Sequence, residues 1–138
     1  MLAREPGRRT QKIRSLKARV FVIHDRLDGL RMYKDLLSQE GYEVATALSV
    51  VEGAGTLRAY FPDLILLDLD QTPAQDAESA RILVESMNGH RIPIVMITLL
   101  GDTPPDPRLP AEVRRCIYKP CRPRTLLEGV SDVLLYAR

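Results

Sequence analysis

The chain has 138 residues, of which 45% are hydrophobic and 28% are charged, a composition typical of one globular domain and not of a disordered or fibrous protein. No apolar run approaches the roughly 20 residues that a membrane span requires, and residues 1–12 contain no stretch suited to a secretory signal. Cys116 and Cys121, with two histidines, are too few for a disulfide framework or a zinc site, so we expect a cytoplasmic protein.

The charge is unevenly distributed. Residues 1–19 hold seven basic side chains and one acidic side chain, whereas the rest of the chain is mildly acidic. We therefore expect a flexible basic arm over residues 1–18 and a folded domain over residues 19–138. Arms of this kind can bind nucleic acid or an anionic membrane surface, although a solvated terminus is the simpler interpretation.

Short runs rich in β-branched and apolar residues predict five strands. The most hydrophobic run, DLILLDL, is typical of a central parallel strand that is covered on both faces. The predicted strands are Arg19–His24, Tyr42–Ala47, Asp63–Leu69, Pro93–Thr98 and Cys116–Tyr118.

Between these runs, apolar residues recur at helical spacing. The first predicted helix follows residue 24 and ends before Gly41, which suits a C-cap. Ser49 is a candidate cap for a second helix that reaches about Tyr60, and the remaining helices are predicted at residues 76–88 and at about Arg124–Tyr136.

Alternating strands and helices predict an α/β fold: a three-layer, flavodoxin-like (βα)5 doubly wound parallel sheet with strand order 2-1-3-4-5. In such folds, ligands bind beyond the carboxyl ends of the strands. The polar residues at these strand ends are therefore the candidates for function.

Two or three carboxylates, a hydroxyl and a lysine stand at those ends: His24-Asp25 after the first strand, Asp68 and Asp70 after the third, Thr98 after the fourth and Lys119 after the fifth. Clustered carboxylates favour a hard cation such as Mg²⁺. An aspartate beside Mg²⁺, with a lysine and a hydroxyl nearby, can accept a phosphoryl group as a nucleophile. Each residue alone also has a structural explanation, such as a helix cap or a turn.

From about Ala18 to Leu135 the sequence resembles the receiver domains of two-component response regulators. The resemblance rests on VFVIHD (20–25), PDLILLDL (62–69), IPIVMIT (92–98) and YKP (118–120). It implies that Asp68 is the phosphoacceptor, that Thr98 is the switch hydroxyl and that Lys119 pairs with the phosphoryl group. It further implies that Mg²⁺ is bound by Asp25, by Asp68 and by the backbone carbonyl of Asp70.

Three residues depart from the receiver pattern. His24 stands where most receivers carry the first of two adjacent acids, so its place among the metal ligands is doubtful and metal binding is expected to be weaker. Leu99 follows Thr98 where receivers generally have a small residue. Cys116 occupies the position of the switch aromatic, and Tyr118, two residues on, should share its face of the strand.

The segment GDTPPDPRLP (101–110) holds four prolines where the fourth helix of a receiver begins. Since proline inside a helix costs about 3 kcal/mol or more, we expect that helix to be degraded, with at most a short piece near Ala111–Arg115. In receivers this face serves output and dimerisation, so a homodimer is left open. Here the face is also rich in arginine.

The leading hypothesis is a stand-alone receiver, not an enzyme acting on a separate substrate, that takes phosphate from a histidine kinase or phosphotransfer protein and signals to an unknown output protein. The alternative is a pseudo-receiver that works as an interaction module without phosphorylation or metal. Nucleic-acid binding through the basic arm is a third and less favoured hypothesis. A flavodoxin-like enzyme is the least favoured, because no glycine-rich phosphate loop follows the first strand.

Overall fold

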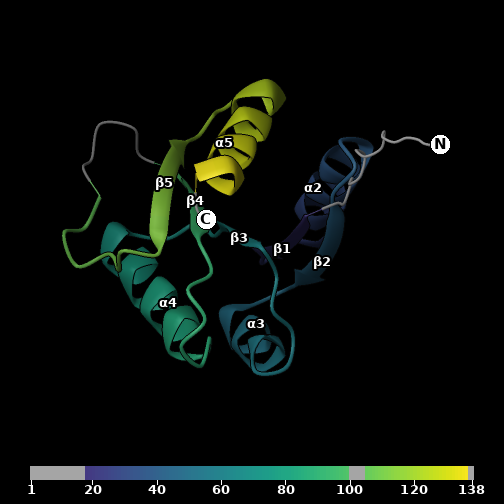
Figure 1. Ribbon diagram of the computed structural model, residues 1–138. Coiled ribbons are helices and arrows are strands. Elements are labelled where there is room, and N and C mark those ends of the chain that lie inside the picture. Colours follow the sequence, from purple (N-terminus) through teal and green to yellow (C-terminus); the bar gives the residue numbers. More distant parts are fainter. Residues whose placement is uncertain (1–17, 100–104, 137–138) are drawn as a thin grey trace.

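The computed structural model describes residues 18–99 and 105–136. The predicted arm, apart from Ala18, and part of the proline-rich segment lie outside these residues. Within them, five parallel strands form one sheet in the order β2-β1-β3-β4-β5, which confirms the predicted topology (Figure 1). The strands are β1 (Arg19–His24), β2 (Glu43–Ala47), β3 (Leu64–Asp68), β4 (Ile94–Thr98) and β5 (Val113–Tyr118).

Four helices cover this sheet in the described residues, as expected for a three-layer fold: α2 (Leu27–Gln39), α3 (Val50–Leu57), α4 (Pro73–Glu85) and α5 (Pro123–Tyr136). Figure 1 shows α3 and α4 on one side of the sheet and α2 and α5 on the other. None of these helices is long and apolar enough to cross a bilayer.

The alternation of side chains along each strand divides the core into two halves. Phe21, Ile23, Ile65 and Leu67 pack with Ala54, Leu57, Ala80 and Leu83 of α3 and α4. Val20, Val22, Leu64 and Leu66 pack instead with Leu30, Leu37, Leu126 and Val130 of α2 and α5. Burial of β1 and β3 on both faces explains why these runs read as almost continuous hydrophobic stretches.

Local signals set several element ends. The Ser49 hydroxyl accepts a hydrogen bond from the backbone N–H of Glu52, as the predicted cap requires. The chain then leaves α4 earlier than predicted, at Glu85 and not residue 88, and Asn88 and Gly89 adopt positive φ values of 53° and 85° in the turn. Gly41 also has a positive φ, 94°, just after α2, as a C-cap glycine should.

The start of α4 differs from the prediction. The helix begins at Pro73 and not at residue 76, because Thr72 and Gln75 form a reciprocal capping box ahead of it. Pro73 is at the first helical position, where its missing N–H costs nothing. Only four residues therefore separate Asp68, the last residue of β3, from the start of the helix.

The expected short helix near Ala111–Arg115 is wrong. Residues 111–112 form a turn and Val113 begins β5, which is longer than the predicted Cys116–Tyr118. Arg114 and Arg115 are exposed on this outermost strand, so its first half carries no apolar signal. Residues 105–112 contain no helix, which confirms for this part of the chain that the fourth helix of the receiver pattern is degraded.

Candidate functional site at the carboxyl edge of the sheet

Strand register places His24 beside Asp68. The two residues are direct partners across the parallel β1–β3 pair. By the alternation of side chains they share the sheet face of Val20, Val22, Leu64 and Leu66, which α2 covers. The predicted site residues at these two strand ends are therefore brought together under the first turns of α2.

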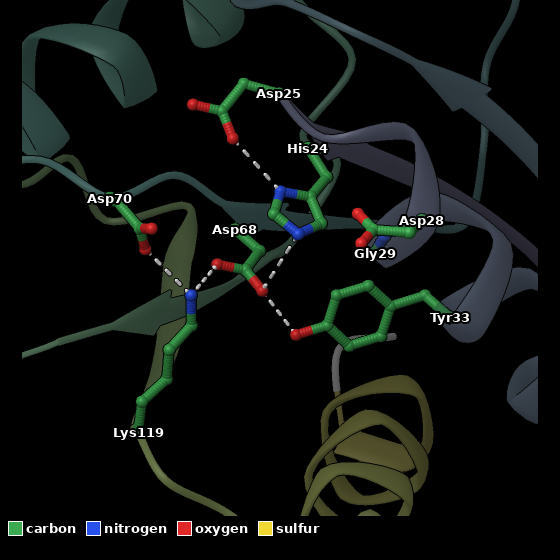
Figure 2. A network of polar contacts seen from close by, with 8 residues as sticks. All are labelled: His24, Asp25, Asp28, Gly29, Tyr33, Asp68, Asp70 and Lys119. Carbon is green, nitrogen blue, oxygen red and sulfur yellow. Dashed lines mark hydrogen bonds and ion pairs between the residues drawn. The ribbon is translucent and has the colours of Figure 1, made fainter.

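Asp68 is buried, with 1% of its surface exposed, and each of its carboxylate oxygens has a neighbour. Nζ of Lys119 lies 2.6 Å from Oδ1, an ion pair without good hydrogen-bond geometry. On the other side, the hydroxyl of Tyr33 donates a hydrogen bond to Oδ2 (Figure 2). A buried carboxylate is costly unless it is paired, so these two groups are what keep Asp68 in its place.

Lys119 joins Asp68 to Asp70, since Nζ also donates a hydrogen bond of 2.9 Å to Oδ1 of Asp70. The partial burial of Lys119 acts to lower its pKa, but the contacts with the two carboxylates outweigh it and raise the pKa. The same hydrogen bond lowers the pKa of Asp70. The backbone N–H of Lys119 donates to the carbonyl of Thr98, and the Lys119–Pro120 peptide bond is cis.

His24 lies beside two carboxylates without forming a hydrogen bond to either. Its ring is buried, with Nδ1 3.3 Å from Oδ1 of Asp25 and Nε2 3.9 Å from Oδ2 of Asp68, and Nδ1 has no hydrogen-bond partner. Figure 2 shows the ring between the two aspartates. Asp25 itself is half-exposed.

Thr98 lies apart from this cluster. It follows Ile97, the register partner of Asp68, so its side chain points toward the opposite face of the sheet. On that face lies Asp76, a buried residue of α4, whose pKa is raised by burial although the hydrogen bond from Gln71 and the nearby Thr98 hydroxyl oppose the shift. Thr98 and Asp76 line a small cavity of about 20 Å³ together with Gln71, Met96, Cys116 and Tyr118.

That cavity confirms the expectation that Cys116 and Tyr118 share a face of β5. Both cysteines are free, in agreement with the absence of a disulfide framework. Leu99, which follows Thr98, is exposed.

The basic face near β5 and α5 is partly neutralised by acids of its own. Arg115 lies 3.6 Å from Asp132, and Arg124 lies 3.5 Å from Glu128. Arg108 pairs with Asp106. The net positive charge of this face is therefore smaller than the row of arginines in the sequence suggests.

Sequence reasoning missed two residues of the site. Tyr33 lies within the first predicted helix, in its row of apolar residues at helical spacing, yet its hydroxyl reaches Asp68. Gly29, in the first turn of α2, lies against the ring of His24. A tyrosine within a buried apolar stripe was the available signal for the first, because a buried phenol needs a hydrogen-bond partner.

Comparison with known proteins shows which family has this arrangement. The sequence profile of the response regulator receiver domain matches residues 20–131. The chain belongs to the response regulator receiver family. The receiver fold therefore accounts for nearly all of the residues that the structure describes.

Individual relatives are distant. The polar-differentiation response regulator DivK of Brucella ovis is 27% identical over 79 residues, which are 57% of this chain and 64% of that protein, so the match spans less than two thirds of the relative. A CheY-like receiver domain from Methanospirillum hungatei JF-1 has a TM-score of 0.69 at 27% identity, covering 86% of this chain and 94% of that one.

A third receiver resembles this chain in fold alone. It is the receiver domain of a sensor histidine kinase from Pseudomonas aeruginosa PAO1, with a TM-score of 0.70, 18% identity and coverage of 86% of this chain and 98% of that one. That structure has a magnesium ion coordinated in its active-site cleft.

Proposed function

We propose that this receiver accepts a phosphoryl group on Asp68 from a histidine kinase or a phosphotransfer protein and signals to an output protein by direct contact. The observation that supports this most is the ion pair of 2.6 Å between Lys119 and Asp68 at the carboxyl end of β3. An oxygen of Asp68 would attack phosphorus while the P–N bond of the donor phosphohistidine breaks, and the electron pair would leave with the imidazole. The Lys119 ammonium group would offset charge on the phosphoryl oxygens.

The donor set fits Mg²⁺ in kind. The carboxylates of Asp25 and Asp68 and the backbone carbonyl of Asp70 are hard oxygen ligands at one edge of the sheet, and Oδ1 of Asp68 is buried without a hydrogen-bond partner. Bound there, Mg²⁺ would supply charge neutralisation for the phosphoryl oxygens. Among residues 18–99 and 105–136, however, no three acidic, histidine or cysteine side chains already converge as a cage.

The proposal includes a role for Thr98 as the hydroxyl that hydrogen-bonds the phosphoryl group, which requires the Thr98 side chain to turn away from Asp76.

The proposal also includes a cytoplasmic location and no catalysis on a separate substrate. Binding to nucleic acid is not part of it. A homodimer through the β5 and α5 face is compatible with it.

Incubation with Mg²⁺ and acetyl phosphate, followed by intact-protein mass spectrometry, tests the proposal. We expect one added phosphoryl group on the natural chain, none on Asp68→Asn, and an unchanged gain on Asp35→Asn, an exposed position on α2. Labelling of Asp68→Asn would move the acceptor to another residue. No adduct on the natural chain would refute phosphoacceptance.

One observation favours the second candidate, a pseudo-receiver that acts without phosphorylation. His24 lies between Asp25 and Asp68, and Tyr33 already hydrogen-bonds Asp68. Protein side chains thus already stand next to both carboxylates. A chain that binds neither Mg²⁺ nor phosphate near neutral pH would have this second function.

A further inference from the structure

The surroundings of Asp68 contain two side chains, His24 and Tyr33, whose positions suggest a role in controlling access. We propose that this blocking pair, His24 and Tyr33, closes Oδ2 of Asp68 to divalent cations, and that a cation enters only when the His24 ring leaves its place. This inference rests on the proposed function for its biological meaning, but it concerns cation binding and can be measured separately.

Tyr33 forms the fixed half of the blocking pair. Only 5% of its surface is exposed, and its hydroxyl donates directly to Oδ2 of Asp68. Burial raises the pKa of the phenol, and the hydrogen bond to Asp68 raises it further, so Tyr33 stays a donor at neutral pH. A hydrogen bond to a charged acceptor is stronger than one between neutral groups. A cation that uses Oδ2 must therefore displace it.

His24 is the second member of the blocking pair, and its ring blocks the site by the space that it occupies. Two carboxylate oxygens that share one Mg²⁺ ion lie within about 4 Å of each other, since Mg–O bonds are about 2.0–2.1 Å. The imidazole ring stands between Asp25 and Asp68, 3.3 Å from the first carboxylate and 3.9 Å from the second (Figure 2). In this place the ring is in contact with both carboxylates and, by our inference, takes space that an ion shared by the two would need.

Gly29 makes room for the ring. A Cβ atom at this position would lie 2.1 Å from Nε2 and 2.3 Å from Cδ2 of His24, far inside contact distance. Any other residue at position 29 would therefore force the imidazole out of its present place. The first turn of α2 thus leaves the space that the His24 ring occupies, and this space requires glycine at position 29.

The His24 ring is held in its place by packing and not by hydrogen bonds. Nδ1 of His24 is buried without a hydrogen-bond partner, and Nε2 is beyond hydrogen-bond distance of Asp68. The ring contacts the aromatic ring of Tyr33, with centroids 5.8 Å apart. A buried nitrogen without a partner gains a hydrogen bond when it reaches water. The ring can therefore leave without breaking a hydrogen bond, which makes the block removable.

The test is cation affinity in the full chain, measured by titration with Mn²⁺ under electron paramagnetic resonance and with Mg²⁺ under calorimetry. We expect Tyr33→Phe to bind the cation about tenfold more tightly than the natural chain, the equivalent of the one charge-assisted hydrogen bond that the cation no longer has to displace. Gly29→Ala should also bind more tightly, because the ring is already out of its place. Gly29→Ala keeps His24, so it separates the position of the ring from its charge. His24→Ala removes the ring altogether and replaces Gly29→Ala should that variant not fold.

Gly55→Ala is the matched control, because a Cβ at this exposed helical position would meet nothing within 4 Å. Its cation affinity should equal that of the natural chain. Equal affinity in the natural chain, Gly29→Ala and Tyr33→Phe would overturn the inference, and so would a lack of binding in all of them. If the variants bind the cation more tightly but the chain takes up no phosphoryl group from acetyl phosphate, the proposed function is refuted and the inference about the blocking pair holds. If the chain takes up the phosphoryl group but all variants bind the cation equally well, the proposed function holds and the inference is refuted.

Discussion

The ion pair between Lys119 and Asp68 is shielded unequally: 26% of the Lys119 side chain is exposed, against 2% of the Asp68 side chain. Water can solvate the ammonium group when the pair is broken, but it cannot reach the carboxylate without a change in structure. The cost of breaking this pair therefore depends on which partner is removed.

Lys119→Met should destabilise the fold by about 1–3 kcal/mol, because it leaves the Asp68 charge buried with only Tyr33 as a partner. Urea denaturation measures this loss. Lys34→Met, at an exposed position of α2, is the control and should change stability by less than about 0.5 kcal/mol. Adding Asp68→Asn to Lys119→Met should recover part of the loss, since the unpaired charge is gone. A loss of stability in Lys119→Met that is no larger than the loss in Lys34→Met would contradict the shielding argument.

Asp76 should make the protein less stable as pH rises. Burial raises its pKa above the usual value of 3.8, so the contribution of Asp76 is most favourable below that value and is lost as pH rises through its raised folded-state pKa. Asp76→Asn removes this titration while keeping an acceptor for Gln71. The stability of Asp76→Asn relative to the natural chain should increase between about pH 3.5 and pH 7. A difference that does not change over this range would show that the carboxyl is not strained by burial.

Asp70 should have the opposite pH dependence. Its hydrogen bond with Lys119 lowers its pKa, so its stabilising contribution is present above the unfolded value of 3.8 and is lost as pH falls through the lowered folded-state pKa. We expect Asp70→Asn to be less stable than the natural chain at pH 7 and to approach it at about pH 3. The effect is modest because 43% of the Asp70 side chain is exposed. Thermal unfolding across this pH range gives the comparison, and parallel curves would contradict it.

Two glycines of α3 give a matched pair. Gly55→Ala should stabilise the protein by about 0.5–1 kcal/mol, because alanine is the better helix former and its Cβ meets nothing within 4 Å. At Gly53 a Cβ would lie 2.6 Å from Cδ1 of the buried Ile23, so Gly53→Ala should show no gain or a loss. Urea midpoints of the two variants decide this. An equal gain in both would mean that Ile23 moves aside freely.

Loss of the α3 cap should cost about 1 kcal/mol. Ser49→Ala removes the acceptor of the Glu52 N–H at the start of a helix of eight residues. Ser49→Asp, which restores an acceptor, should recover this loss. A neutral Ser49→Ala would show that water caps the helix equally well.

The sequence analysis predicted most accurately the strands that are buried on both faces of the sheet. Arg19–His24 was predicted with its observed bounds because β1 lies inside the sheet and every residue after Arg19 is buried. The sheet edge was harder. In β5 the exposed Arg114 and Arg115 hide the first half of the strand. The resemblance to receivers, which have a helix in this segment, led instead to the expectation of a short piece of helix near Ala111–Arg115.

The set of site residues could also be predicted, since the topology of a parallel sheet alone brings Asp68, Lys119 and His24 to one edge. Which of these side chains contact one another could not be predicted. Whether Thr98 turns toward Asp68 or toward Asp76 is decided by a register offset of one residue. The contribution of Tyr33 depends on the docking angle of α2, which no local pattern encodes. The start of α4 was a missed signal, because Thr72 and Gln75 have the spacing of a capping box.

Gln71, in the loop between β3 and α4, donates from one amide nitrogen to Asp76 and to Ser79, at 3.1 Å and 2.9 Å. These two acceptors lie about one helical turn apart on α4, so the residue next to Asp70 is fastened to the helix at two points. The loop and the helix consequently form one mechanical unit. A displacement of Asp70 would therefore move this helix of thirteen residues, whose last residue, Glu85, lies beside α3.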